Sequence, residues 1–179
     1  KENFKTITLV HETNPDIITD IFSGDICKMG ILDSQLDDDD IIINLIGQYE
    51  ENLVKFVNTN VHGAFSILNS VSKKKNIKII LISSISVYGE NLEHLSKEFD
   101  ELHPKSIYGI VKLVSEKIFE NYSIVNKTDT TILRTSTLYG PNKKTGHIVN
   151  LIKSINNHVS TVAYNNGNQI RDLLFVNDA

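Results

Sequence analysis

What this sequence has little of narrows the kinds of protein it can be. It contains a single cysteine, Cys27, among 179 residues. One thiol cannot form a disulfide framework, and a reducing compartment is the ordinary setting for such a chain. No apolar run approaches the length of a membrane-spanning helix, and the opening KENFKTITLV is not typical of a signal peptide. These absences together predict a cytoplasmic protein that has no membrane partner.

An excess of basic charge is also absent. Lys and Arg number 18 against 22 Asp and Glu, which leaves a formal net charge of −4. Nucleic-acid-binding surfaces are usually basic, so this balance argues against a nucleic-acid partner. Arginine is scarce, and the locations of Arg134 and Arg171 are therefore informative. The length and an apolar content of 40% suit one domain with a core.

Segments with strand-like and helix-like patterns alternate along the chain. Strands are expected at residues 6–10, 16–22, 41–45, 130–133 and 162–164, and in the apolar run that begins at Ile77. Helices are expected at residues 51–71 and 147–155, and from Ser106 onward. This alternation predicts an α/β fold with a doubly wound, mainly parallel sheet. The apolar runs at Ile41 and Ile77 are typical of strands buried on both faces. The acidic run 37–40 lacks the glycine of a calcium loop, so we expect no metal site there.

The clearest chemical signal lies between residues 77 and 119. The strand beginning at Ile77 ends in Ser83, Ser84 and Ser86, and ligands of open parallel sheets bind just beyond the carboxyl ends of the strands. The helix that follows carries Tyr108 and Lys112, which are four residues apart and therefore on one face. A Tyr-x-x-x-Lys spacing also arises by chance, so the order of strand, serines, loop and helix favours the functional interpretation over a solvated helix.

One motif of dinucleotide-binding folds has no counterpart. A Rossmann sheet binds the pyrophosphate through a glycine-rich loop after its first strand, but the first glycine here is Gly24. We therefore expect a Rossmann-like domain over residues 1–179 that lacks the first βα unit and most of a C-terminal substrate domain. The substrate-binding part is expected to start within 141–179.

In this order the motifs resemble the extended short-chain dehydrogenase/reductase family. Within it they are similar to the NAD-dependent epimerases and dehydratases of nucleotide sugars, of the UDP-glucose 4-epimerase type. The matching segments are GDI at 24–26, INLIG at 43–47, NTNVHGA at 58–64, SSISVYG at 83–89, YGIVK at 108–112, LRTSTLYGP at 133–141 and YNNGNQIRDLLFVND at 164–178.

The resemblance implies an NAD cofactor, with NADP as the alternative. Cofactor contacts are implied for Asp25, Ile26, Leu45, Ile46, Gly47, Thr59 and Ser136. Asn60 is implied to have a structural role, and Asn44 stands where the family usually has His. His11 and Glu12 follow the first expected strand and are candidates for the adenosine ribose, although a plain loop explains them equally well.

The same resemblance implies a nucleotide-sugar substrate. Ser84, Tyr108 and Lys112 would be catalytic, while Ser86, Thr137 and Arg171 would face the substrate. Arg171 would reach the phosphates, and the family usually has Asn at the place of Thr137. In the implied reaction Tyr108 removes a hydroxyl proton while a hydride leaves the same sugar carbon for the nicotinamide. An ordinary phenol has a pKa near 10. We expect the ammonium of Lys112 to lower the pKa of Tyr108, because a cation about 4 Å away favours the phenolate by up to ~4 kcal/mol.

Three functions stay open at this point. Epimerisation and NAD(P)H-dependent reduction of a 4-keto sugar nucleotide each need only Ser, Tyr, Lys and a nicotinamide. Dehydration is not expected, because the related dehydratases carry Thr-Asp-Glu where this chain has Ser84, Ile85 and Ser86. A non-catalytic dinucleotide-binding accessory protein is the alternative from another class, although such proteins generally lose the Tyr/Lys pair.

The resemblance also implies a homodimer in which the two long helices form a four-helix bundle with those of a second copy. Apolar residues occur on more than one side of the second helix, at Ile110, Leu113, Val114, Ile118 and Phe119. Burial inside the domain would explain the same pattern.

Overall fold

The computed structural model describes all residues except 1–5, 11–19, 48–51, 90–94, 161–163 and 169. It divides into two compact units, Lys1–Arg134 and Thr135–Ala179, where the sequence suggested one domain. The assignment of a substrate-binding part within residues 141–179 stays a prediction.

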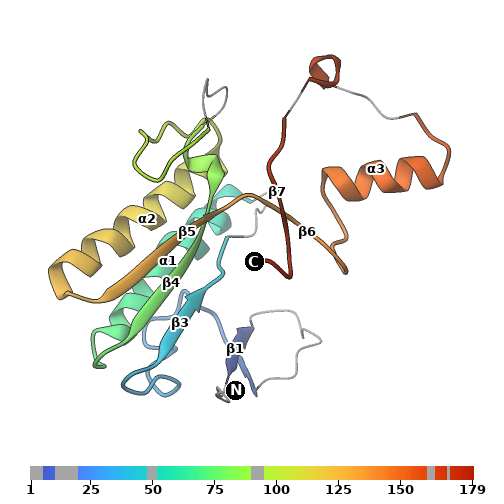
Figure 1. Cartoon of the computed structure of the whole chain (residues 1–179). Helices are drawn as coiled ribbons and strands as arrows, with labels where there is room; N and C mark the ends of the chain where they lie inside the picture. The colour runs from blue at the N-terminus through green and yellow to red at the C-terminus, as the bar shows by residue number, and fades with distance from the viewer. Residues whose placement is uncertain (1–5, 11–19, 48–51, 90–94, 161–163, 169) are drawn as a thin grey trace. The chain divides into compact units, whose positions relative to one another are not determined.

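Strands and helices of the first unit follow one another in the expected order (Figure 1). The strands are β1 (Ile7–Val10), β2 (Asp20–Ser23), β3 (Ile41–Asn44), β4 (Lys78–Ser84) and β5 (Asp129–Thr135), whose last residue opens the second unit. The helices are α1 (Leu53–Val71), the 3-10 turn η1 (Ile85–Val87) and α2 (Ile107–Asn126). β1 pairs with β2 and β3 with β4, both in parallel, and β5 lies on the other side of β4. Parallel strands joined through helices confirm the predicted α/β class.

The strands form two sheets, β1–β2 and β3–β4–β5, instead of one. In a Rossmann sheet of strand order 3-2-1-4-5-6, the first strand lies between the second and the fourth. If β1 and β2 take the second and third places, β3 takes the fourth. The break then falls at the place of the first strand, which the described residues do not supply. The arrangement therefore fits the expectation of a doubly wound sheet without its first βα unit.

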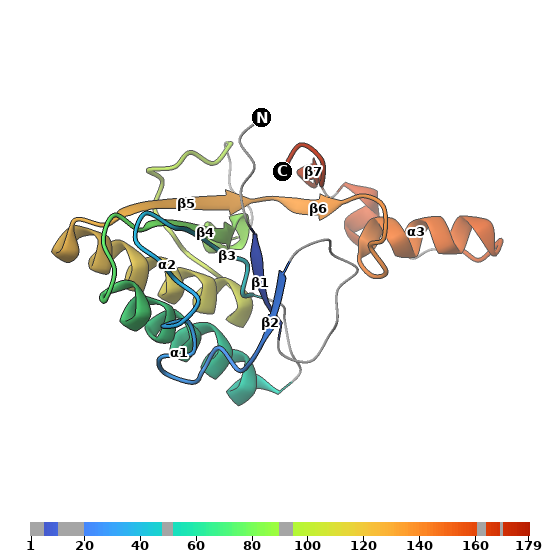
Figure 2. The same ribbon diagram turned by 90° about the horizontal axis from the view of Figure 1, so that it is seen from below.

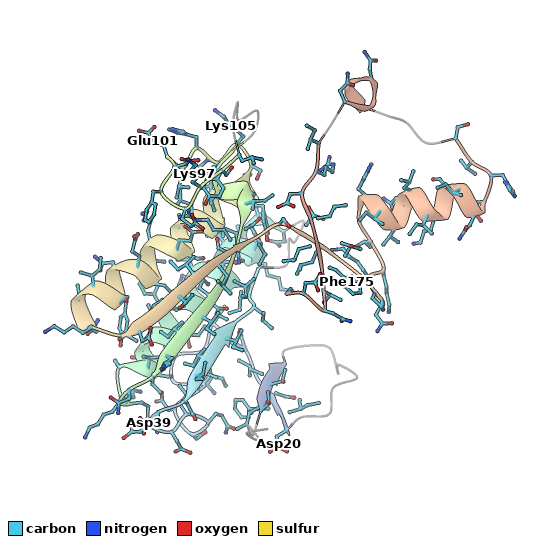
Figure 3. The ribbon with its side chains drawn as sticks, viewed as in Figure 1. Asp20, Asp39, Lys97, Glu101, Lys105 and Phe175 are labelled. Atoms are coloured by element: carbon cyan, nitrogen blue, oxygen red, sulfur yellow. The ribbon has the colours of Figure 1, made fainter. Side chains whose placement is uncertain are left out.

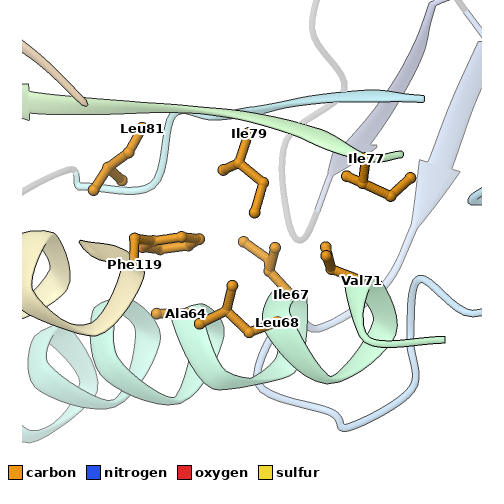
Figure 4. Packing of buried hydrophobic residues seen from close by; sticks show 8 residues of the cluster. All are labelled: Ala64, Ile67, Leu68, Val71, Ile77, Ile79, Leu81 and Phe119. Atoms are coloured by element: carbon orange, nitrogen blue, oxygen red, sulfur yellow. The ribbon is translucent and has the colours of Figure 1, made fainter. Parts of the chain in front are cut away.

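Both long helices lie on the same side of the β3–β4–β5 sheet (Figure 2). Their apolar faces meet the sheet in one hydrophobic cluster, formed by Ala64, Ile67, Leu68, Val71, Ile77, Ile79, Leu81 and Phe119 (Figure 4). Each helix begins at a polar cap. The Asn52 side chain accepts a hydrogen bond from the Lys55 amide at 3.0 Å, and the Ser106 hydroxyl accepts one from the Gly109 amide at 3.0 Å. The second cap places Tyr108 in the first turn of α2.

On the opposite face of this sheet β3 is exposed and β4 is only partly buried, which contradicts the prediction that 41–45 and the run from Ile77 are buried on both faces. Ile41 and Ile43 are 50% and 57% exposed, whereas Ile42 and Asn44 point toward the helices. β4 alternates in the same way between buried and partly buried residues. Parallel sheets are normally covered on both faces, whereas both long helices of the first unit lie on the other face of this one.

The second unit contains β6 (Thr137–Tyr139), α3 (His147–Asn156), the 3-10 turn η2 (Tyr164–Gly167) and β7 (Leu173–Phe175). β6 pairs in parallel with β7, and the rings of Tyr139 and Phe175 lie 5.4 Å apart. The expected strand at 162–164 is not found: Tyr164 opens η2, and 162–163 lie outside the described residues. The expected strand at 16–22 begins at Asp20 where it is described. Within the described ranges, no helix is both long and apolar enough to cross a membrane.

Candidate active site

Ser84 lies at the carboxyl end of β4, where it is also the N-cap of η1. Its hydroxyl oxygen accepts hydrogen bonds from the Ser86 amide at 3.2 Å and from the Ser86 hydroxyl at 3.0 Å. These two donors fix the position of the oxygen, and the hydroxyl hydrogen can still be donated. Ser84 also forms a hydrogen bond with Tyr108, so the structure brings these two predicted residues into contact.

Tyr108 is held by aromatic packing from the other helix. Its ring stacks on that of Phe56 in α1, with the centroids 6.1 Å apart and the planes inclined by 18°. Phe56 is only 1% exposed, so it provides a fixed surface for the phenol ring. Burial raises the pKa of Tyr108, and the hydrogen bond with Ser84 opposes part of that effect.

Lys112 lies one turn further along α2 and is 3% exposed. Its ammonium donates hydrogen bonds to the carbonyl oxygens of Ile46 at 2.8 Å and Ile82 at 2.7 Å. These carbonyls lie just after β3 and near the end of β4, so the amine bridges the carboxyl ends of two neighbouring strands. Burial lowers the pKa of Lys112 to about 8, and the charge of Glu116 opposes this effect. The side chain is therefore mainly an ammonium at neutral pH.

The predicted effect of Lys112 on the Tyr108 pKa is wrong for this structure. The pKa of Tyr108 is raised instead of lowered, because burial is the largest influence on the phenol. The ammonium is directed at the two backbone carbonyls, and these hydrogen bonds hold it at the strand ends. Without a bound ligand, Tyr108 is thus a neutral phenol that can donate a proton.

Two glycines allow these groups to come together. A Cβ on Gly47 would lie 2.6 Å from the Lys112 nitrogen, and the φ of Gly47 is +153°. A Cβ on Gly109 would lie 2.6 Å from the carbonyl oxygen of Ser86, so this glycine lets the first turn of α2 approach η1 closely. Both positions explain local sequence: INLIG ends in the first glycine, and YGIVK contains the second.

The predicted cofactor residues of the first unit lie on neighbouring segments. A Cβ on Gly63 of α1 would be 3.3 Å from side-chain atoms of both Ile26 and Ile46, so the segments after β2 and β3 meet over this helix. Thr59, one turn earlier, is partly buried and forms a hydrogen bond with Cys27. Leu45 is 73% exposed at the strand end. These residues therefore lie near the carboxyl ends of β2 and β3, and the Lys112 amine is bonded to one of them, Ile46.

Other predicted residues have more limited outcomes. The Asp25 carboxylate accepts a hydrogen bond from the Cys27 amide at 2.9 Å, which orders the turn after β2. Asn60 is buried and donates to the Phe56 carbonyl oxygen at 2.8 Å, in keeping with the structural role implied for it. His11 and Glu12 lie outside the described residues. Three further predicted residues belong to the second unit, and their roles stay predictions: Ser136, Thr137 and Arg171.

Sequence reasoning missed the side chains that support the site. Phe56 lies within the expected helix 51–71, but no sequence pattern marks its ring as the one that stacks on Tyr108. Glu116 follows Lys112 by four residues and so lies on the same face of α2, and this spacing is the signal that could have indicated it. In the structure it is buried and forms an ion pair with Arg134 at 2.9 Å.

Figure 3 shows Lys97, Glu101 and Lys105 on the segment that precedes α2, far from Asp39 at the other end of the first unit.

The parallel strands, the helices on one face and the Ser, Tyr and Lys side chains at the strand ends define an α/β dinucleotide-binding class of protein. The sequence profile of the NAD dependent epimerase/dehydratase family matches residues 2–179. The chain belongs to this family.

Relatives and solved structures agree with this assignment. The chain is 32% identical to Protein CapI from Staphylococcus aureus, over 99% of this chain and 52% of the relative. It is 33% identical to a putative UDP-glucose 4-epimerase from Methanocaldococcus jannaschii, over 72% of this chain and 44% of that protein. The structure is similar to that of UDP-glucuronic acid 4-epimerase from Bacillus cereus in complex with NAD. Here the TM-score is 0.79 and the identity 27%, with 89% of this chain and 52% of the other covered. The chain thus spans about half the length of the relatives it matches.

Proposed function

We propose that this chain carries the catalytic group and part of the cofactor-binding surface of an NAD-dependent nucleotide-sugar epimerase. The observation that carries the proposal is the convergence of Ser84, Tyr108 and Lys112 at the carboxyl ends of β3 and β4. Family membership and the NAD complex of the Bacillus cereus epimerase support the cofactor and the substrate class.

The residues present fit a dinucleotide. Gly47 keeps the end of β3 free of side-chain atoms beside the Lys112 ammonium, where a single Cβ would collide with it. Asp25, Ile26 and Thr59 would hold the adenosine part, and Leu45, Ile46 and Gly47 would line the path toward Lys112. When bound, NAD supplies the acceptor that takes a hydride from the sugar carbon and returns it. NADP is the alternative cofactor.

The protein's own groups would move the proton and hold the sugar. Ser84 would hydrogen-bond the reacting hydroxyl, because its oxygen is already fixed by Ser86 and adjoins Tyr108. Tyr108, as the phenolate that the positive charge of bound oxidised nicotinamide would favour, would take the proton of that hydroxyl and later return it. Lys112 would be held beside the cofactor by its hydrogen bonds to the carbonyl oxygens of Ile46 and Ile82. Ser86, Thr137 and Arg171 are proposed to contact the sugar nucleotide.

A reductase is the second candidate, because the same three side chains serve both reactions. An assay of net NAD(P)H consumption with a 4-keto sugar nucleotide separates the two. An epimerase interconverts UDP-sugars without net consumption, whereas a reductase consumes one reduced cofactor for each product. If the protein binds the cofactor but turns over no substrate in either reaction, the result would instead favour a non-catalytic dinucleotide-binding accessory protein. Mass spectrometry of copurified nucleotide would identify NAD or NADP.

We also propose a homodimer formed through α1 and α2. An open groove of about 910 Å³ runs between these helices, and most of its lining is apolar. Its walls include Phe65, Leu68, Ile110, Leu113, Val114 and Val125. Phe65 is 51% exposed and Ile110 47%. A second copy would offer the same apolar stripe, so a symmetric pairing would cover both.

The scarcity of cysteine supports the cytoplasm as the compartment of the protein.

A further inference from the structure

Behind the catalytic group lies a buried carboxylate that the proposed reaction does not use. Glu116 of α2 is 2% exposed. The Arg134 guanidinium grips it as a fork: Nε lies 3.1 and 3.2 Å from the two carboxylate oxygens, and Nη2 lies 2.9 Å from Oε2. The Ser83 hydroxyl donates to Oε1. The Arg134 Nε and Nη2 and the Ser83 hydroxyl thus all donate to this carboxylate.

The other arm of Arg134 reaches two more segments. Its Nη1 donates to the Tyr88 hydroxyl at 2.9 Å and to the Glu98 carbonyl oxygen at 3.0 Å. The guanidinium carbon also lies 5.0 Å from the centroid of the Tyr88 ring. One side chain from β5 therefore joins α2, the residue after η1 and the segment that leads into α2.

Each segment held in this way carries or adjoins a catalytic side chain. Ser83 immediately precedes Ser84 in β4. Tyr88 is the C-cap of η1, whose N-cap is Ser84. Glu116 lies on α2, one turn after Lys112 and two turns after Tyr108. The node formed by Ser83, Tyr88, Glu116 and Arg134 thus connects the strand that carries Ser84 with the helix that carries the Tyr/Lys pair.

We propose that Glu116 and Arg134 are positioning residues that fix the end of β4 against α2, and that they thereby set the geometry of Ser84, Tyr108 and Lys112. This inference rests on the proposed function. Stability alone does not require such a node, because apolar side chains of similar volume often replace a buried ion pair without loss. A bidentate guanidinium–carboxylate pair, however, permits only a narrow range of orientations.

The node also acts on Lys112 through charge. Glu116 opposes the lowering of the Lys112 pKa by burial. The uncharged carbonyl groups of Ile46, just after β3, and of Ile82, in β4, face the amine, and Tyr108 is the titratable group one turn before it on α2. Loss of the Glu116 charge should therefore lower the pKa of Lys112, which the titration of the amine measures directly.

The test compares Glu116→Gln with Glu120→Gln in the protein. Glu120 is a matched control, because it lies on the same helix in an exposed ion pair with Lys117. Three quantities are measured: the titration midpoint of the Lys112 amine by ¹⁵N NMR, NAD affinity by calorimetry, and kcat with whichever of UDP-glucose, UDP-glucuronate and UDP-N-acetylglucosamine turns over. For Glu116→Gln we expect a downward shift of the midpoint and a kcat reduced at least ~10-fold, with NAD affinity within about twofold. Glu120→Gln should change none of them.

If Glu116→Gln does not fold, Ser83→Ala and Arg134→Lys take its place, since each removes only part of the node. Both keep the Glu116 charge, so the Lys112 midpoint should stay close to that of the wild type, while kcat should fall, by less than in Glu116→Gln. A folded variant of the node that loses thermal stability but keeps the wild-type midpoint and kcat would overturn the proposal. The midpoint needs no substrate: a shift with no turnover in the wild type would refute the proposed function and leave the node's influence on Lys112 established.

Discussion

The ring of Tyr108 lies on the ring of Phe56, with the centroids 6.1 Å apart and an angle of 18° between the planes. The two residues come from different helices, so the stack ties the orientation of the phenol to the packing of α1 against α2. Phe56 is fully enclosed, whereas the phenol oxygen faces Ser84.

Phe56→Leu should therefore impair the reaction more than the fold. The shorter, flexible side chain cannot fix the plane of the phenol ring, and we expect kcat to fall about tenfold. The free energy of unfolding should fall by about 1–2 kcal/mol, less than the ~3–5 kcal/mol typical of truncation to Ala. Steady-state kinetics and urea denaturation provide the two numbers. Phe65→Leu, on the exposed side of the same helix, should leave kcat at the wild-type value; an equal loss in both variants would refute the role of the stack.

Gly47→Ala should displace Lys112. The new Cβ would lie 2.6 Å from the amine nitrogen, and the backbone has a φ of +153° that alanine rarely adopts. We expect NAD affinity, measured by calorimetry, to fall at least tenfold. Gly167→Ala is the control, because its φ of +78° is also strained but no atom lies within 4 Å of the added Cβ. Unchanged affinity in Gly47→Ala would mean that the Lys112 amine is not part of the cofactor site.

The buried amine should also be visible in the pH dependence of stability. The pKa of Lys112 is about 8 in the folded protein against an ordinary value of 10.5. Between these two values the unfolded chain binds an additional proton, so the free energy of unfolding contributed by this group rises with pH. The destabilisation caused by burying the Lys112 ammonium is fully present below pH 8 and absent above pH 10.5.

The comparison of wild type with Lys112→Met isolates this contribution, because the other titrating groups are common to both. The wild type should gain stability relative to the variant by on the order of 3 kcal/mol from pH 8 to pH 10.5. Chemical denaturation at four or five pH values measures the difference. Parallel stability curves for the two proteins would show that Lys112 is not buried as the structure has it.

The apolar groove between α1 and α2 predicts that the protein self-associates. Sedimentation of the wild type at micromolar concentration should show a dimer, and Val114→Glu should convert it to a monomer with unchanged secondary structure. Val114 is 40% exposed, so a charge there costs the isolated chain little but would be buried in the dimer. Ile124→Glu is the control, since Ile124 is 72% exposed on the same helix and does not line the groove. A monomeric wild type would contradict the proposed dimer.

The order of strands and helices could be predicted because hydrophobic periodicity is a local property. The helical periodicity that identified α1 and the apolar run that identified β4 each depend on a few neighbouring residues, and both elements begin within two residues of the expected start. The pair Tyr108 and Lys112 could be placed on one face for the same reason. By contrast, the exposure of Ile41 and Ile43 could not be predicted, because an apolar run does not say whether a second layer covers the sheet.

The chemistry around the site depends on contacts between residues far apart in sequence. The Lys112 amine is held by a carbonyl 66 positions earlier, and Arg134 grips Tyr88 across 46 positions. No local pattern specifies such distances. The prediction that the Tyr108 pKa is lowered was wrong for this reason. The sequence shows that a lysine is one turn away, but it does not show that the phenol is buried or that the amine is directed elsewhere.

The most direct test of the account is turnover by Tyr108→Phe, measured with the same UDP-sugar panel and with NAD binding followed in parallel. This variant keeps the stack on Phe56 and removes only the oxygen that exchanges the proton. The account predicts a kcat lowered by about 10²–10⁴-fold, with NAD affinity within about twofold of wild type. Turnover at the wild-type rate would contradict it.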